Sequence, residues 1–209
     1  PYLYKEVQAA QNLDLHRGLA DFERAFGGHI AFALSNASGA FFHNLTGGLF
    51  GQVPPNAYGT AEWYRQLWRQ SRNFALVADL TVATLGGGLK TRQRLTGRMA
   101  DALSELYFLA CVLKRYEDDG KPAGDRRIVE LCARNGLYRC QEALAGAIDN
   151  FPHTPTRMLL RGLVFPLGRH YKPARDRLAS EVVRLASKPG DVRDRLTRHI
   201  HISKDVNDP

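Results

Sequence analysis

Apolar residues recur every three or four positions along most of the chain, which is the spacing of one face of an α-helix. The longest repeat spans residues 18–45, where small residues would also let other helices approach closely, so we expect a buried helix there. No stretch alternates apolar and polar residues over the length of a strand. The pattern therefore predicts an all-α fold, with long helices joined by short loops in one or more bundles. The other predicted helices cover residues 3–13, 60–85, 95–116, 125–150 and 156–164. A further predicted helix ends near residue 186, and a short last helix follows residue 191.

Glycine and proline interrupt this pattern in two places. Residues 46–59, "TGGLFGQVPPNAYG", are dense in both and predict a linker or crossing loop, after which Thr60 is placed to cap the next helix. Residues 165–178, "FPLGRHYKPARDRL", predict a basic turn that leads into a further helix.

The segment 84–98, "TLGGGLKTRQRLTGR", superficially resembles a phosphate-binding loop. A P-loop is excluded because Lys90 follows leucine rather than glycine, and because a helical pattern rather than a strand precedes it. Two interpretations stay open. The glycines lie within a helix or at a kink against which another helix packs, and packing or a turn then offsets roughly 2–3 kcal/mol of lost helix propensity. Alternatively, a basic stripe serves an acidic partner or a phosphate, and its members are Lys90, Arg92, Arg94 and Arg98.

The formal net charge is +8, and residues 157–201 hold most of the excess, with eleven Lys and Arg against four Asp and Glu. Such a patch favours anionic partners: phospholipid, nucleic acid or a phosphorylated ligand. Within residues 157–172, Arg161, Arg169 and Lys172 are candidates for contact with a membrane surface; in the alternative, the apolar residues pack on the bundle and the arginines point outward. Basic charge without a helix-turn-helix pattern or zinc spacing predicts no specific nucleic-acid partner.

Composition places the chain among globular proteins, with 44% apolar and 24% charged residues. No apolar run is long enough to span a bilayer and no signal peptide is evident, so we expect a cytoplasmic protein. The three cysteines, Cys111, Cys132 and Cys140, are expected to be reduced. His199 and His201 could share one side of an extended chain, but a third ligand is missing, so no metal site is expected.

Carboxylates are side chains that could act as the general base of an enzyme. Three glutamates lie on predicted helices among apolar neighbours, and we expect each to be solvated or ion-paired: Glu105, Glu130 and Glu142. Asp79 lies in an apolar stretch and is expected to form a structural salt bridge with Lys90 or an arginine. His29 and His43 are expected to be hydrogen-bonded core residues or surface residues rather than catalytic ones.

Several blocks of the sequence resemble the C-terminal domain of the large bacterial acyl-coenzyme A dehydrogenases of fatty-acid β-oxidation. The most distinctive are the glycine-lysine block, "ADLTVATLGGGLKTRQRLTGRMADALSELYFLACVLKRYEDDG", and "VFPLGRHYKPARDRL". The blocks "PYLYKEVQAAQN", "LYRCQEALAGAIDNFP" and "RDRLTRHIHISKD" are similar as well, so that the resemblance covers essentially all 209 residues. One departure is Ala174-Arg175, where relatives often have Pro-Ser.

The resemblance implies an FAD-dependent enzyme that removes two hydrogens from a fatty acyl-coenzyme A, with a glutamate as the base. In the family this glutamate and most flavin-binding residues lie upstream of the segment that this chain covers, so the resemblance assigns no catalytic and no cofactor-binding residue here. We expect the chain to be a piece of a longer polypeptide, inactive and without FAD when alone. Its expected partners are the rest of the dehydrogenase, further copies in a homo-oligomer, and the inner face of a membrane.

The resemblance also implies a division of the chain. Residues 1–46 would complete the helical bundle of the flavin domain, residues 47–59 would be a linker, and residues 60–209 would form an auxiliary helical domain with a basic C-terminal segment. A competing interpretation, which needs no enzyme, is a basic helical module that anchors a larger protein to a membrane or a partner subunit.

Overall fold

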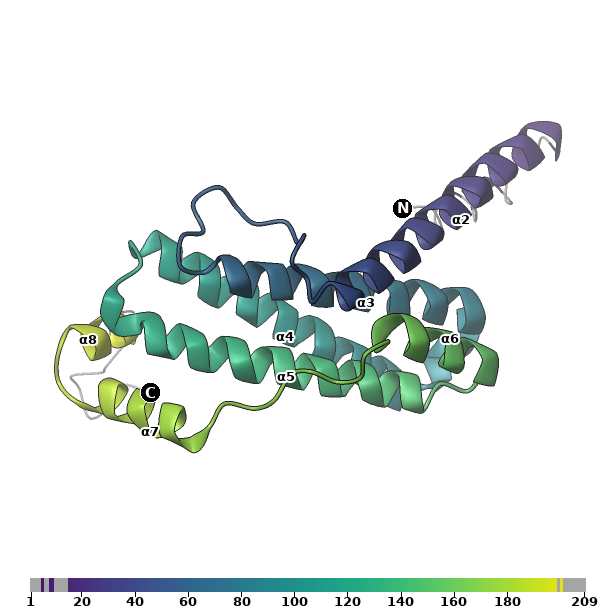
Figure 1. Ribbon diagram of the computed structural model, residues 1–209. Helices are drawn as coiled ribbons and strands as arrows, with labels where there is room; N and C mark the ends of the chain where they lie inside the picture. The colour runs from purple at the N-terminus through teal and green to yellow at the C-terminus, as the bar shows by residue number, and fades with distance from the viewer. Residues whose placement is uncertain (1–4, 6–7, 10–14, 199, 201–209) are drawn as a thin grey trace, which may run out of the picture.

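The computed structural model describes all residues except 1–4, 6–7, 10–14, 199 and 201–209. The regular structure of the described part is helical and includes no strand, which confirms the predicted all-α fold (Figure 1). The helices are α2 (Leu15–Leu45), α3 (Ala61–Leu85), α4 (Gln93–Asp118), α5 (Arg126–Asp149), α6 (Thr154–Val164), α7 (Asp176–Ser187) and α8 (Asp191–Thr197), with short 3-10 turns at η1 (Gly86–Thr91) and η2 (Ala123–Asp125).

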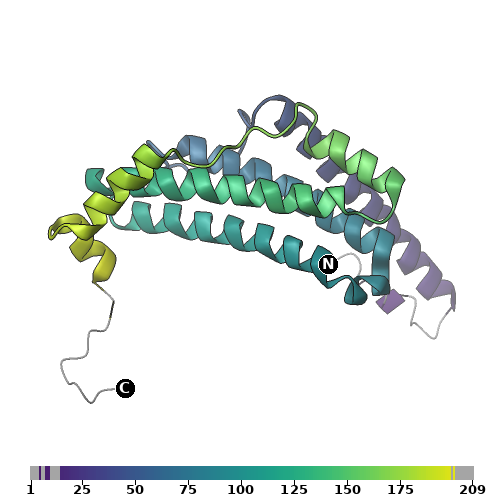
Figure 2. The ribbon, with the colours of Figure 1, turned by 90° about the horizontal axis from the view of Figure 1, so that it is seen from below.

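Helices α3, α4 and α5 lie side by side and form the body of the molecule (Figures 1 and 2). Apolar side chains fill two clusters between them, because each helix presents an apolar face every three to four residues. The larger cluster includes Leu76, Leu144 and Ile148 together with Leu160 of α6, and the smaller one joins α4 to α5. Helices α7 and α8 lie at the end of the α4–α5 hairpin, where Arg195 pairs with Asp125 at 2.7 Å.

The predicted helix over residues 18–45 is present as α2, but it is not buried along its whole length. Its last third packs on α3 and α6, and Ala40 lies fully in the core. Its earlier part extends away from the body (Figure 1), and Leu19 and Leu34 are 58% and 65% exposed. The expectation of a buried helix is therefore wrong for much of the earlier part, where Ala25 is buried but large apolar side chains such as Leu19 and Leu34 remain exposed.

Residues 46–60 form the predicted loop between α2 and α3. Gly51 is needed there because a Cβ atom would stand 3.0 Å from both the Cα and the carbonyl oxygen of Arg65. Thr60 precedes α3 as predicted, but its side chain makes no capping bond and donates to Glu117 Oε1 at 3.2 Å instead. The predicted helix over residues 3–13 falls mostly outside the described residues.

The three glycines make a turn between two helices. Helix α3 ends at Leu85, the chain reverses through η1, and α4 begins at Gln93. A Cβ atom on Gly86, Gly87 or Gly88 would meet no atom within 4 Å, so no helix packs against their backbone. The interpretation that another helix packs against the glycines is therefore wrong. The glycines instead form the turn at which α3 ends, and their low helix propensity favours this end. Only Gly86 needs to be glycine, because its φ of 46° and ψ of −126° are unfavourable for any L-residue.

We expect Gly86→Ala to lower the free energy of unfolding by about 1–3 kcal/mol, since alanine at this φ and ψ is strained. Gly87→Ala is the matched control, because Gly87 has an ordinary negative φ and open space around it, and it is expected to be neutral or slightly stabilising. Urea denaturation followed by circular dichroism measures both. Equal effects of the two substitutions would contradict this account of the turn.

Candidate functional site

The basic stripe of the glycine turn faces a shallow cavity. Arg92, Arg94 and Arg98 line a cavity of about 490 Å³ with Asn150 and Pro152, which follow α5. Lys90 lies exposed on η1 and is not among the lining residues. Within the described part of the chain, none of these four cations has a carboxylate oxygen within 4.0 Å. The stripe therefore keeps its positive charge, but its members are largely open to solvent, where counterions screen them.

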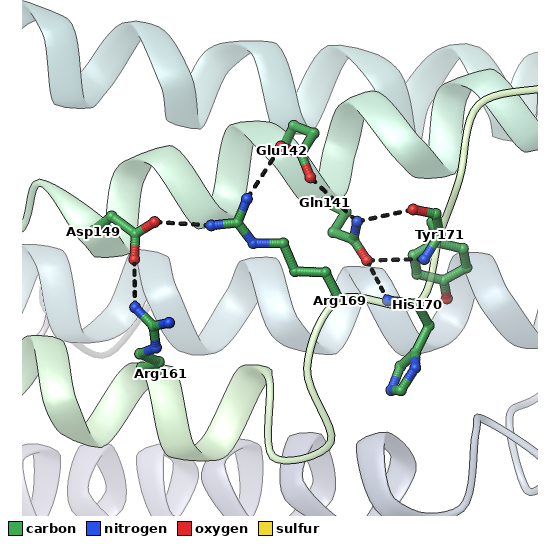
Figure 3. Close-up of polar contacts among 7 residues, drawn as sticks. All are labelled: Gln141, Glu142, Asp149, Arg161, Arg169, His170 and Tyr171. Carbon is green, nitrogen blue, oxygen red and sulfur yellow. Dashed lines mark hydrogen bonds and ion pairs between the residues drawn. The ribbon is translucent and has the colours of Figure 1, made fainter.

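Arg161 and Arg169 are placed differently, because both bind acidic side chains of α5 (Figure 3). Arg161 Nη1 lies 3.2 Å from Asp149 Oδ1, and Arg169 Nη2 lies 2.9 Å from Asp149 Oδ2. Arg169 Nη1 also reaches Glu142 Oε2 at 3.2 Å. Two arginines and two carboxylates thus balance their charges within the molecule, so that Arg161 attaches α6 to α5 and Arg169 attaches residues 165–175 to it. All four side chains are more than one-third exposed, which limits each pair to tenths of a kcal/mol.

Residues 165–175, here called the strap, lie along α5 and are fixed by one buried side chain (Figure 3). Gln141 is 2% exposed, and its Oε1 accepts hydrogen bonds from the backbone N–H groups of His170 at 2.8 Å and Tyr171 at 3.0 Å. Its Nε2 donates to the carbonyl oxygen of Tyr171 at 3.1 Å. Because the strap has no helical hydrogen bonds of its own here, Gln141 takes their place.

The strap forms one wall of a cavity of about 960 Å³, which we call the cleft. Its other walls come from α3, α5 and the loop between α2 and α3. Lys172, which was also a candidate from the sequence, lies exposed at the edge of the cleft, together with Arg175. The further charged residues that line the cleft are Arg69, Arg126, Arg134, Glu62 and Glu130.

A network of buried amides supports the inner wall of the cleft. Asn44 is 1% exposed and forms two hydrogen bonds with Asn73. Asn44 Nδ2 donates to Asn73 Oδ1 at 2.7 Å, and Asn73 Nδ2 donates to Asn44 Oδ1 at 3.2 Å. Asn44 Nδ2 also donates to the carbonyl oxygen of Leu163 at 3.0 Å, and Asn44 Oδ1 accepts from Arg69 Nε at 2.8 Å. These bonds connect α2, α3 and α6 around a single arginine.

The three glutamates that the sequence considered as bases are all bound by arginines, as expected. Arg139 holds Glu105 through two hydrogen bonds of 2.5 and 2.9 Å, Arg127 and Arg134 hold Glu130, and Arg169 holds Glu142. For Glu130, partial burial raises the pKa, but the hydrogen bonds and charges of its two arginines outweigh this and lower it. A carboxylate with a lowered pKa is a weak base, so Glu130 is not suited to removing a proton.

Asp79 forms no salt bridge with Lys90 or an arginine in the described structure, and that expectation is wrong. Its Oδ2 accepts from Asn36 Nδ2 at 2.8 Å, and Asn36 Oδ1 accepts in turn from Arg72 at 3.1 Å. The charge of Arg72 thus reaches Asp79 only through an amide, because α2 inserts Asn36 between them.

His43 is buried, with 9% exposed, and its Nδ1 has no hydrogen-bond partner. Burial, together with the charges of Arg72 and Arg69, lowers the pKa of His43, so the ring is neutral at physiological pH. The side chain of His29 and both His199 and His201 lie outside the described part of the chain. Within that part, no three His, Cys, Asp or Glu side chains are grouped to hold a metal, and no helix is long and apolar enough to cross a membrane.

The three cysteines are free thiols in different surroundings. Cys111 is exposed, whereas burial raises the pKa of Cys140 to about 12. At pH 8 this leaves on the order of one Cys140 side chain in ten thousand as the reactive thiolate. We expect Ellman's reagent to modify Cys111 rapidly in the folded protein and Cys140 only after denaturation. Mass spectrometry of tryptic peptides measures the two rates, and equal rates in the folded protein would contradict the burial of Cys140.

The residues that organise this region were not among the sequence-based candidates. Arg69, Asn44 and Gln141 lie on segments whose apolar periodicity predicted a helix but indicated no role for their polar side chains. One signal was present: Arg69 and Asn73 are four residues apart on the face of α3 that turns toward other helices, where polar residues need partners. Those partners come from α2 and the strap, which are distant in sequence.

A model of the family described as acyl-CoA dehydrogenase, C-terminal, bacterial type, matches residues 1–209. The match spans the whole chain and confirms the resemblance that the glycine-lysine and "FPLGRHY" blocks carry. No solved structure matches the chain.

Proposed function

The chain belongs to the family of bacterial-type acyl-CoA dehydrogenase C-terminal domains, and from this membership we propose that it is the C-terminal helical part of an FAD-dependent enzyme that acts on fatty acyl-coenzyme A in β-oxidation. FAD, when bound to such an enzyme, supplies the acceptor for the hydride that leaves the β carbon. The part played by this chain is assembly of the enzyme rather than chemistry.

The state of the carboxylates supports an assembly role. A base that removes the α proton of a thioester has to be free of cations and directed into a pocket. Glu105, Glu130 and Glu142 are each bound by at least one arginine, and Asp79 is bound by an amide. We therefore propose that the catalytic glutamate lies in the remainder of the polypeptide.

The lining of the cleft offers little free surface for a flavin ring. A flat tricyclic ring stacks on an aromatic or apolar surface, but arginines already lie over two of the three aromatic rings that line the cleft, which are those of Trp63, Tyr116 and Tyr171. Arg134 lies 5.8 Å from the ring centre of Trp63, and Arg69 lies 5.7 Å from that of Tyr171. We propose no flavin contact for these residues, and no step of the reaction is assigned to them.

The exposed part of α2 supports an interaction with the rest of the enzyme. Leu19, Phe26 and Leu34 are each about half exposed or more, along a helix that extends away from the body (Figure 1). Exposed apolar surface of this kind is typical of an interface. We propose that residues 1–46 complete a helical bundle of the flavin domain, that residues 60–209 form the auxiliary domain, and that further copies assemble with it in a homo-oligomer.

A comparison of the complete polypeptide with the chain alone tests this function. The complete polypeptide is expected to carry the yellow flavin and to reduce an electron acceptor in the presence of palmitoyl-coenzyme A. The 209-residue chain alone is expected to show neither property. Turnover by the chain alone, with bound FAD, would contradict the assembly role.

The exposed face of α6 favours a second function, contact with a membrane at the cytoplasmic side. Leu160 and Val164 pack in the core, but Met158 and Leu159 are 69% and 53% exposed beside basic residues. Sedimentation with vesicles of anionic and of neutral lipid tests this. Binding that requires anionic lipid and falls with salt supports a membrane role, whereas indifference to lipid leaves assembly as the function.

A further inference from the structure

Arg69 is a buried cation without a counter-charge. Its residue surface is 6% exposed, and within the described part of the chain no carboxylate oxygen lies within 4.0 Å of it. Its contacts are uncharged: Nε donates to Asn44 Oδ1 at 2.8 Å, and the guanidinium lies over the ring of Tyr171. Neutral groups satisfy hydrogen bonds but leave the charge in place, and an uncompensated buried charge is unfavourable.

The surroundings of Arg69 add to this positive charge. Three other cations that line the cleft, Arg126, Lys172 and Arg175, also have no carboxylate partner in the described structure. Of the two acids in the lining, Glu130 is already bound by two arginines. The pKa of His170 is lowered mainly by burial and, to a smaller extent, by the positive charge of Arg69. The cleft is therefore positive from its inner wall to its edge.

The size and position of the cleft suit a ligand rather than an ion alone. Its volume of about 960 Å³ is at the upper end of the range for small-molecule sites. Arginine presents a planar fork of donors that matches two oxygens of a phosphate group, and lysine adds a mobile point charge. Arg69 comes from α3 and Lys172 and Arg175 from the strap, so the cations converge from two elements.

We propose that the cleft binds a soluble phosphorylated compound, whose phosphate meets Arg69 at the inner wall while Lys172 and Arg175 neutralise further oxygens at the edge. This goes beyond the assembly role and does not depend on dehydrogenation. A phospholipid headgroup shares the chemistry, but Arg69 is too deeply buried to reach the surface of a bilayer. The basic stripe of Arg92, Arg94 and Arg98 is the weaker candidate, because it is exposed to screening and includes no buried cation.

Calorimetric titration with inorganic pyrophosphate tests the proposal, with the complete polypeptide that contains this chain at constant ionic strength. Arg69→Gln is expected to weaken binding at this site at least tenfold, and Arg69→Lys by less. Two controls remove one charge elsewhere: Arg72→Gln, one turn further along α3 but outside the cleft, and Arg94→Gln in the basic stripe. Both are expected to change the affinity less than twofold.

Three results would overturn the proposal: no pyrophosphate binding that depends on Arg69, equal weakening in all the glutamine variants, or Arg69-dependent binding to anionic vesicles without a response to pyrophosphate. Equal weakening would indicate attraction by net charge alone, and the vesicle result would indicate a lipid headgroup. If Arg69→Gln does not fold by circular dichroism, the double variant Lys172→Gln/Arg175→Gln replaces it. This variant changes only exposed side chains, and the same tenfold loss is expected.

Discussion

Replacing Gln141 with leucine is expected to lower the free energy of unfolding by about 2–4 kcal/mol. The substitution keeps a side chain of similar size on α5 but removes three hydrogen bonds to the strap, two from backbone N–H groups and one to a carbonyl oxygen. Each such bond contributes about 0.5–1.5 kcal/mol, and a buried group left without a partner costs about 1–3 kcal/mol. Urea denaturation followed by circular dichroism measures the loss.

The same variant should release the strap before the helices unfold. Hydrogen exchange followed by mass spectrometry is expected to show faster exchange in residues 165–175, with little change in α3 and α4. Gln93→Leu is the control, because Gln93 is exposed in the first turn of α4 and its substitution should change stability by less than about 0.5 kcal/mol. Unchanged exchange in the strap of Gln141→Leu would show that Gln141 does not hold it.

The cleft depends on this attachment. Tyr171 lies on the strap, its hydroxyl donates to Gln66 Oε1 at 2.5 Å, and its ring covers Arg69. A released strap would expose Arg69 to water and would remove Lys172 and Arg175 from the edge of the cleft. The buried amide of Gln141 thus connects the stability of the fold to the positive charge of the cleft. The "FPLGRHYKP" block therefore holds residues that bond to the interior as well as residues on the surface.

The helices could be predicted from the sequence because their apolar periodicity is a local property. Residues 18–45 repeat every three to four positions, and α2 runs from Leu15 to Leu45. What this pattern could not indicate is which part of the helix is covered. The exposure of Leu19 and Leu34 depends on elements that pack on α2, and a periodicity within one helix carries no information about its partners.

The candidate site could be predicted only in part, for a similar reason. The ion pairing of Glu105, Glu130 and Glu142 could be expected from the sequence, because the chain is basic and has many arginines that can reach a carboxylate. The roles of Gln141 and Arg69 follow from bonds to residues 29 and 25 positions away, in the strap and at the end of α2. The sequence left packing and a turn open for the glycines because low helix propensity suits both, and the open space around them and the φ of Gly86 distinguish the two.

The substitution Asn44→Ala is expected to have the largest effect, a loss of about 3–5 kcal/mol in the free energy of unfolding, from the lost hydrogen bonds and the buried polar groups left without partners. Asn44 satisfies Arg69 Nε and bonds to Asn73 and to the carbonyl oxygen of Leu163, so that alanine would leave a buried guanidinium with one N–H unpaired. Asn150→Ala is the matched control. Asn150 is exposed, and in the described structure its side chain bonds only to Gly146 O in the last turn of α5, which it follows, so the loss should stay below about 0.5 kcal/mol.

A double variant separates the charge from the amide network. Asn44→Ala/Arg69→Met removes the unpaired cation as well, and it is expected to be more stable than Asn44→Ala alone, because replacing a buried ion by an apolar side chain is often neutral or stabilising. Urea denaturation of the four members of the cycle gives the coupling energy. If the double variant is less stable than Asn44→Ala by the full effect of Arg69→Met, the two residues act independently. In that case Arg69 contributes through packing rather than as the buried charge that we infer.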